Sequence, residues 1–331
     1  MQTFGGAARG RLAPMRLVVA GSPAAAVPTL RALAASDHEI GAVLTRPPTP
    51  QGRKRVLTPT PVAQVAAELG LPVIEASRVD DEVTARIAAL GVDLGVIVAY
   101  GALLRRPALD APRLGWVNLH FSDLPAYRGA APVQRAVMAG DTTTAATVFQ
   151  LVEALDAGPV YASEPFTIDP EATSGEVLAA MAETGADVVV RVVDALARGT
   201  ATATEQVGSP TTAPKLTLED GRTDFAASAH LVHARLRGVT PEPGAFAHLG
   251  ETRVKLLRAH RLAARDGRPG GTGGSAPDLA PGALRLVDGA LLVGTADEPL
   301  VLAEVQPAGK KAMDAAAWAR GLGPLDGKVL A

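Results

Sequence analysis

No cysteine occurs among the 331 residues of this chain. Disulfide bonds, thiolate metal ligands and a cysteine nucleophile are therefore excluded. No run approaches the roughly 20 apolar residues that a membrane-spanning helix needs, and residues 1–14 lack the apolar core of a secretion signal. We therefore expect a cytoplasmic protein, with residues 1–14 as a disordered extension or a misassigned start.

Nucleotide-binding signatures are also missing. The turn after the first apolar run, Gly21–Pro23, contains neither G-x-G-x-x-G nor a P-loop, so nothing supports a nicotinamide or ATP site. The formal net charge of −2 lacks the basic surplus typical of general nucleic-acid binders. One local exception is a proline-rich loop that carries Arg46, Arg53, Lys54 and Arg55. Taken alone, this cluster indicates a solvated surface loop.

The first half of the chain alternates short apolar runs with helical patterns, beginning at Met15. Repeated β-α-β units predict an α/β domain with a doubly wound, mostly parallel, Rossmann-like sheet. Ligands bind such sheets at the carboxyl ends of their strands. Tyr100–Gly101 and His120–Ser122 are both predicted strand ends, so we expect a site there.

The second half changes character after a helix predicted over about 175–199. The segment TATATEQVGSPTTAP has no periodicity and predicts a linker. Short β-like runs follow, with a hairpin signal at Asp288-Gly289, and they predict a small OB-like β-barrel. We therefore expect a first domain over 15–199, a linker over 200–219 and a second domain over 220–331, in line with the roughly two domains that the length suggests.

The most informative stretch is GWVNLHFSDLPAYRGAAPVQRAVMAGD, which begins at Gly115. Its first residues form a predicted strand, on which Asn118 and His120 share a face about 7 Å apart. Strands of a covered α/β sheet are normally apolar on both faces. Asp156 follows at the predicted end of the next strand, TVFQLVEAL. Each residue alone more often has a structural role, but together they predict a site.

Such a trio suits acyl or formyl transfer to an amine. A carboxamide and an imidazole can stabilise a developing oxyanion. A carboxylate can tune the imidazole and accept a proton from the amine. If the substrate supplies the nucleophile, no Ser or Cys nucleophile is needed, and the trio can converge without any metal. His230 and His233 lie three residues apart without an evident third ligand, and they indicate a solvated amphipathic helix.

These motifs resemble a known family. The stretch around Asn118, with LDAGPV, resembles the pattern of the 10-formyltetrahydrofolate-dependent formyltransferases and is most similar to the methionyl-tRNA formyltransferase family. The resemblance runs nearly end to end, from MRLVVAGSPAAAVPTL to VQPAGKKAMDAAAWARG. It includes GRKRVLTPTPV, VIVAYG, APKLTLEDGRTDF and PEPGAF, most of which lie outside the catalytic motif.

The resemblance implies a role for each group of residues. Asn118 and His120 would polarise the formyl oxygen, and Asp156 would assist proton transfer from the amine of methionine on initiator tRNA. The co-substrate 10-formyltetrahydrofolate would contact Ser122, Asp123, Leu124, Pro125, Val98, Tyr100 and Gly101. The tRNA would contact the second domain and the basic residues Arg46, Arg53, Lys54, Arg55 and Lys215. The implied enzyme is a monomer without a metal.

Some residues depart from the family pattern, and two other functions stay open. Asp123 stands where the family has Leu, Ala157 and Pro159 alter the usual LDTGD, and Glu242 stands where an aromatic residue is common. These changes bear on folate and tRNA contacts more than on the reaction. One alternative is a formyltransferase for an amino-sugar nucleotide, which has less use for the basic loop. Another is a catalytically silent folate- or tRNA-binding protein, against which the intact trio argues.

Overall fold

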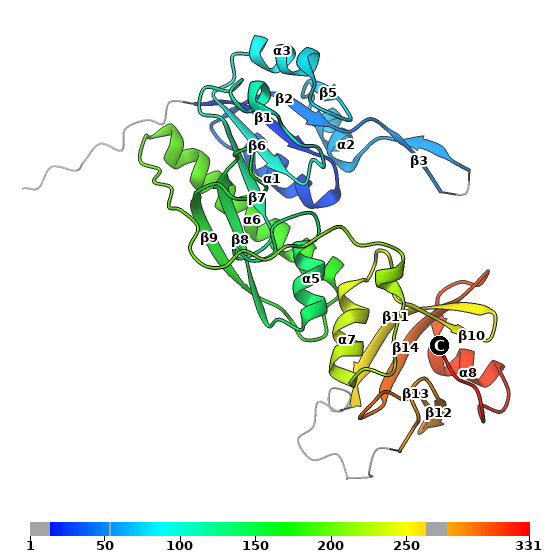
Figure 1. Ribbon diagram of the computed structural model, residues 1–331. Helices are drawn as coiled ribbons and strands as arrows, with labels where there is room; N and C mark the ends of the chain where they lie inside the picture. The colour runs from blue at the N-terminus through cyan, green and yellow to red at the C-terminus, as the bar shows by residue number, and fades with distance from the viewer. Residues whose placement is uncertain (1–13, 53, 263–276) are drawn as a thin grey trace, which may run out of the picture. The chain divides into compact units, whose positions relative to one another are not determined.

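The computed structural model of this protein describes residues 14–52, 54–262 and 277–331 (Figure 1). The predicted extension, apart from residue 14, and Arg53 of the basic cluster lie outside the described residues. The chain divides into two compact units. The first contains the residues up to Arg128, Ala145–Pro165 and Ala179–Pro210, and the second contains Gly129–Thr144, Phe166–Leu178 and Thr211–Ala331.

A seven-stranded sheet has the order β5-β2-β1-β6-β7-β8-β9. Its strands are β1 (Arg16–Gly21), β2 (Glu39–Thr45), β5 (Val73–Glu75), β6 (Leu94–Val98), β7 (Trp116–His120), β8 (Thr143–Gln150) and β9 (Val160–Thr167). The pairs β5–β2, β2–β1, β1–β6 and β6–β7 are parallel, whereas β8 pairs antiparallel with β7. The predicted mostly parallel sheet is therefore confirmed.

Helices lie between these strands, and one long helix follows the last strand. They are η1 (Ala24–Ala26), α1 (Val27–Ala34), α2 (Pro61–Glu68), α3 (Asp81–Ala89), α4 (Arg106–Leu109), α5 (Pro132–Ala139) and α6 (Ser174–Ala197). Local sequence explains where two of them begin. The side chains of Thr60 and Asp80 accept main-chain N–H bonds at the starts of α2 and α3, and such caps satisfy donors that have no partner inside the helix.

Close packing fixes β7 in the sheet. On one face, Gly185 of α6 leaves room for Leu119, because a Cβ there would lie 2.8 Å from the Leu119 side chain. On the other face, Trp116 is fully buried and donates its indole N–H to the carbonyl of Ala108 in α4. The Trp116 ring also occupies the space that a Cβ on Gly95 of β6 would fill. Asn118 and His120 share the Trp116 face.

The proline-rich basic segment is a β-hairpin. Strands β3 (Thr49–Gln51) and β4 (Val56–Thr58) pair antiparallel, and Figure 1 shows the hairpin extending away from the seven-stranded sheet. The prediction of an irregular loop is therefore wrong here. Three-residue strands are too short to show an alternating pattern, and the prolines favour a loop assignment.

The second unit contains an antiparallel sheet of order β10-β11-β14-β13-β12, with β15 beside β14. Its elements are α7 (Ala229–Gly238), β10 (Phe246–Leu249), β11 (Thr252–Arg261), β12 (Leu284–Val287), β13 (Ala290–Val293), β14 (Leu300–Pro307), β15 (Met313–Asp314) and α8 (Ala315–Gly321). Leu249 pairs with Leu330, and Ala283 pairs with Val329. The last residues of the chain thus join the two edges of the sheet, in agreement with the predicted barrel.

The structure decides two predictions for the second half of the chain, one on the turn at Asp288-Gly289 and one on the helix that carries His233. The hairpin at Asp288-Gly289 is confirmed, since both residues have positive φ (49° and 76°) between β12 and β13, as its two-residue turn requires. The prediction of a solvated helix is wrong for His233, which is only 3% exposed. No helix in the described parts of the chain is long and apolar enough to cross a membrane.

Candidate active site

His120, the last residue of β7, is held in one orientation. Its Nε2 lies 2.9 Å from the carbonyl oxygen of Tyr127, and a carbonyl can only accept, so Nε2 carries the hydrogen. Burial lowers the pKa of His120, although the Asp156 carboxylate and the bond to Tyr127 oppose that shift. The ring is therefore neutral at pH 7, and its Nδ1 lone pair is available as a proton acceptor.

Asp156 reaches His120 by a different route from the predicted one. The strand TVFQLVEAL was expected to continue to Leu155, but β8 ends at Gln150. Because β8 is antiparallel to β7, with His120 opposite Thr147, this end of β8 lies beside the start of β7. Asp156 instead belongs to the loop between β8 and β9, which brings the carboxylate Oδ2 to 3.9 Å from Nδ1 of His120.

The loop turns Asp156 inward. The preceding residues 152–155 are exposed, whereas Asp156 is 8% exposed. Its φ is +45°, a left-handed conformation that Asp tolerates better than most residues. Ala99, after β6, and Tyr127 also have positive φ, at 49° and 59°. Three non-glycine residues with such a backbone therefore belong to segments at or near the predicted site, and strain of this kind is concentrated at functional sites in proteins.

Asn118 completes the trio. It lies on the same face of β7 as His120 and is partly exposed. Among the described residues, none forms a hydrogen bond with its side chain. A carboxamide that is half-buried without a partner can donate to a ligand oxygen. The structure thus brings Asp156 to His120 and places Asn118 on the same strand face as His120, and the joint action of the three stays a prediction.

The predicted folate loop has both structural and accessible members. Ser122 is fully buried, donates its hydroxyl to the carbonyl of Ala126, and accepts a 2.7 Å bond from Thr147 Oγ1 at its own carbonyl. Leu124 is buried, Pro125 is partly exposed and Asp123 is exposed. Ser122 therefore shapes the loop, while Asp123 and Pro125 remain accessible to a ligand.

The residues at and just after the end of β6 also divide into buried and accessible ones. Val98 and Tyr100 are buried, and the Tyr100 hydroxyl donates to the carbonyl of Ala76 at 2.7 Å. Burial raises the pKa of Tyr100. Gly101 is exposed, and its carbonyl accepts a 2.8 Å bond from Nη1 of Arg46. A ligand at this strand end would thus meet main chain and Arg46 rather than the Val98 or Tyr100 side chains.

The predicted basic residues are accessible where they are described. Lys54 and Arg55 are exposed on the β3–β4 hairpin, next to exposed Val56 and Leu57. Arg46 is partly buried and tied to Gly101. Lys215 is exposed and belongs to the second unit.

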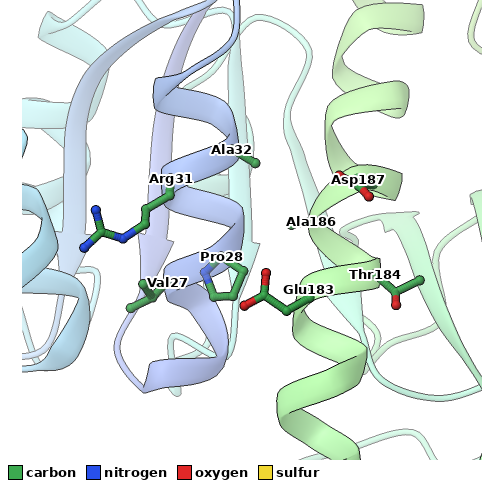
Figure 2. A pocket seen from close by; sticks show the side chains of 8 residues that line it. All are labelled: Val27, Pro28, Arg31, Ala32, Glu183, Thr184, Ala186 and Asp187. Atoms are coloured by element: carbon green, nitrogen blue, oxygen red, sulfur yellow. The ribbon is translucent and has the colours of Figure 1, made fainter.

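A hollow in the surface of the first unit lies between α1 and α6 (Figure 2). Its volume is about 610 Å³, and its lining residues are Val27, Pro28, Arg31, Ala32, Glu183, Thr184, Ala186 and Asp187. Figure 2 shows Arg31 directed away from Glu183, and Arg31 instead pairs with Glu68 at 2.6 Å. The hollow contains none of the trio.

Within residues 14–52, 54–262 and 277–331, no three His, Asp or Glu side chains are arranged to hold a metal ion.

Sequence patterns missed two residues that bear on the trio. Tyr127 acts through its carbonyl, and any residue type supplies a carbonyl, so no side-chain signal was available. Gln206 lies in the aperiodic segment that predicted a linker. Its two amide atoms bond to groups beside the trio.

Family models match both halves of this chain. The model of the formyl transferase family matches residues 15–193, and that of the formyl transferase C-terminal domain matches residues 215–323. A methionyl-tRNA formyltransferase of Clavibacter sepedonicus is 54% identical over 93% of this chain and 97% of the relative. One of Arthrobacter sp. (strain FB24) is 51% identical over 95% and 99%.

Solved structures share the fold at low sequence identity. HypX from Aquifex aeolicus in complex with tetrahydrofolic acid has a TM-score of 0.62 and 18% identity, and the match covers 95% of this chain but 48% of HypX. An N-formyltransferase from Helicobacter canadensis, in complex with folinic acid and dTDP-3-aminofucose, has a TM-score of 0.64 and 13% identity over 87% and 98% of the two chains.

The two family matches together define a formyl-transferring enzyme with an N-terminal and a C-terminal domain. At about half identity over nearly the whole length of its relatives, this chain belongs to the methionyl-tRNA formyltransferase family.

Proposed function

We propose that this protein transfers the formyl group of 10-formyltetrahydrofolate to the α-amino group of methionine on initiator tRNA, for translation initiation in the cytoplasm. The observation that carries the proposal is the approach of Asp156 to Nδ1 of His120, on the strand face that also carries Asn118. Relatives about 50% identical, named methionyl-tRNA formyltransferase, support the choice of substrates.

In the proposed reaction, the amine forms a C–N bond to the formyl carbon, and the bond from that carbon to N10 of the folate breaks. One proton moves from the amine to N10. Asn118 donates to the formyl oxygen as negative charge develops there. Nδ1 of His120, assisted by the Asp156 carboxylate, accepts the proton of the amine; the protonated Nδ1 hydrogen-bonds to the formyl oxygen and then delivers that proton to N10. Tyr127 keeps Nε2 occupied, so Nδ1 is the ring atom that reacts.

Binding of both substrates is part of the proposal. The folate contacts the strand ends through Ser122, Asp123, Leu124 and Pro125, and through the segment of Val98, Tyr100 and Gly101, where the main chain and Arg46 are accessible. The tRNA contacts Arg46, Arg53, Lys54, Arg55 and Lys215, and a domain over 220–331. Clustered cations bind phosphates. The enzyme acts as a monomer, and its reaction needs no metal.

The proposal is tested with purified protein, 10-formyltetrahydrofolate and either initiator Met-tRNA or dTDP-3-aminofucose. We expect formyl-Met-tRNA and no formylated sugar nucleotide. Formylation of the sugar alone would overturn the tRNA assignment, and binding without transfer to either acceptor would make the protein catalytically silent.

Contact of the hairpin with tRNA has a separate test. Replacing Lys54 and Arg55 together by Glu should weaken tRNA binding and flatten its salt dependence, because fewer counterions are released. The matched control reverses Arg78 and Arg86, which are exposed elsewhere in the first unit. An unchanged salt slope in the hairpin variant would leave the hairpin as an ordinary surface feature.

A further inference from the structure

The side chain of Gln206 links the main chain at Asp156 to the side chain of Arg128. Its Nε2 donates to the carbonyl oxygens of Asp156 (2.8 Å) and Gly158 (2.9 Å). Its Oε1 accepts from Arg128, at 2.6 Å from Nη2 and 3.2 Å from Nε. Arg128 follows Tyr127, whose carbonyl binds His120. Both ends of the Gln206 amide therefore form hydrogen bonds. The NH2 group binds the main chain of Asp156, and the oxygen binds Arg128, the residue after Tyr127.

Main-chain pairing brings Gln206 to this position. Thr204 and Val160 exchange two hydrogen bonds, of 2.7 and 2.9 Å, in an antiparallel bridge. Continuing that register by two residues places Gln206 opposite Gly158. From residue 204 to residue 212 all side chains are exposed except that of Gln206, which is half-buried. The segment thus turns one polar side chain inward, at the loop that carries Asp156.

The bond to the Asp156 carbonyl acts on a strained residue. Asp156 has a φ of +45°, which costs free energy for any residue with a Cβ. Strained conformations persist only where surrounding contacts fix them. The adjacent main-chain bonds of the loop, Gln150 N–H to Pro159 and Ala157 N–H to Ala154, do not involve the Asp156 carbonyl. The Gln206 amide does bind that carbonyl directly.

We propose that Gln206 is a positioning residue for formyl transfer. It holds the backbone of Asp156 so that the carboxylate faces Nδ1 of His120, and through Arg128 it links this backbone to the Tyr127 segment that fixes Nε2. Gln206 touches neither substrate. This inference rests on the proposed function, because turnover of formyl donor and Met-tRNA is its readout.

The decisive variant is Gln206→Glu. A carboxylate keeps the acceptors for Arg128 but cannot donate to the Asp156 and Gly158 carbonyls. We expect kcat to fall by about 10- to 100-fold, since small displacements of reacting groups cost about 10²-fold, while KM for both substrates stays within about twofold. Gln206→Met, of similar size and without polar groups, should have the same effect. Gln64→Glu is the control, because the Gln64 side chain, in the first turn of α2, donates to the carbonyl of Pro59, which precedes that helix.

A double-mutant cycle with Asp156→Asn separates positioning from general stabilisation. If Gln206 acts through Asp156, then Gln206→Glu should lower kcat by less than about twofold in the Asp156→Asn background. Independent, multiplying losses, or a kcat near wild type for both Gln206 variants, would overturn the inference while leaving the proposed function intact. A wild-type protein that fails to formylate Met-tRNA would instead overturn the proposed function, and this inference with it.

Discussion

Two buried histidines, one in each unit, have similar partners arranged in different ways. His120 is 5% exposed and His233 is 3% exposed, and Nε2 of each lies near a main-chain carbonyl oxygen, at 2.9 Å from Tyr127 and 3.1 Å from Ala259. Burial is the main cause that lowers the pKa of each, in the case of His233 to about 4. By residue type and burial alone, the two sites would be hard to tell apart.

The position of the carboxylate distinguishes them. Asp156 lies at Nδ1 of His120, on the nitrogen opposite the carbonyl bond. Glu171 lies 3.6 Å from Nε2 of His233, the nitrogen that already faces a carbonyl, and it also lies 2.7 Å from Nδ1 of His260. The Nε2 of His233 thus has its hydrogen bond to the Ala259 carbonyl, and Glu171 lies just beyond hydrogen-bond distance of the same nitrogen. At His120 the carboxylate lies beside the other nitrogen, Nδ1, so the two sites differ in where their partners lie rather than in the types of those partners.

The largest expected contrast is in turnover. Asp156→Asn should lower kcat by about 10²-fold or more, because general acid–base assistance is commonly worth that. Glu171→Gln, the matched change at His233, should leave kcat within about twofold. Formation of formyl-Met-tRNA at saturating substrates measures both. Equal losses in the two variants would remove the distinction between the sites.

The second contrast is in acid stability. Because the folded-state pKa of His233 is lowered from 6.5 to about 4, the unfolded chain binds a proton first as the pH falls. The stability that neutral His233 contributes is thus complete above pH 6.5 and is lost as the pH falls toward 4, by about 2–3 kcal/mol. His233→Gln keeps an N–H donor but cannot titrate. Urea unfolding at pH 6.5 and 4.5 should show a smaller loss for this variant, and equal losses would contradict the assignment.

The smallest expected effect is on the imidazole pKa values themselves. NMR titration should give His120 a pKa below 6.5, since burial is the largest cause of its shift. Each carboxylate opposes that shift at its own histidine. Asp156→Asn should therefore lower the pKa of His120 further, and Glu171→Gln should do so for His233, without cross-effects. A rise in either pKa would show that the charge pairing has been assigned wrongly.

Strand alternation predicted the face shared by Asn118 and His120, because side chains alternate rigidly along any strand. The same reasoning failed at Asp156. The apolar residues of LVEAL continue a strand pattern, but β8 ends where Gln150 bonds to Pro159 and Leu151 bonds to Trp116. Those partners are set by tertiary structure, which a local pattern does not contain.

Contacts made by main-chain atoms were beyond sequence reasoning for a different reason. The carbonyl of Tyr127 orients His120, and the carbonyl of Asp156 is the target of Gln206. Neither contact requires a particular residue type at the accepting position. An aperiodic, Thr- and Pro-rich segment also gives no reason to single out Gln206 from its exposed neighbours.

The absence of a side chain at Gly95 also affects which residues of β7 face the proposed site. The Trp116 ring fills the space beside Gly95. This contact fixes the register of β7 against β6. A slip of one residue would turn Val117 and Leu119 toward the substrates in place of Asn118 and His120. The placement of the proposed catalytic groups therefore depends on packing in the hydrophobic core, and we expect a methyl group added at Gly95 to lower turnover without touching any reacting atom.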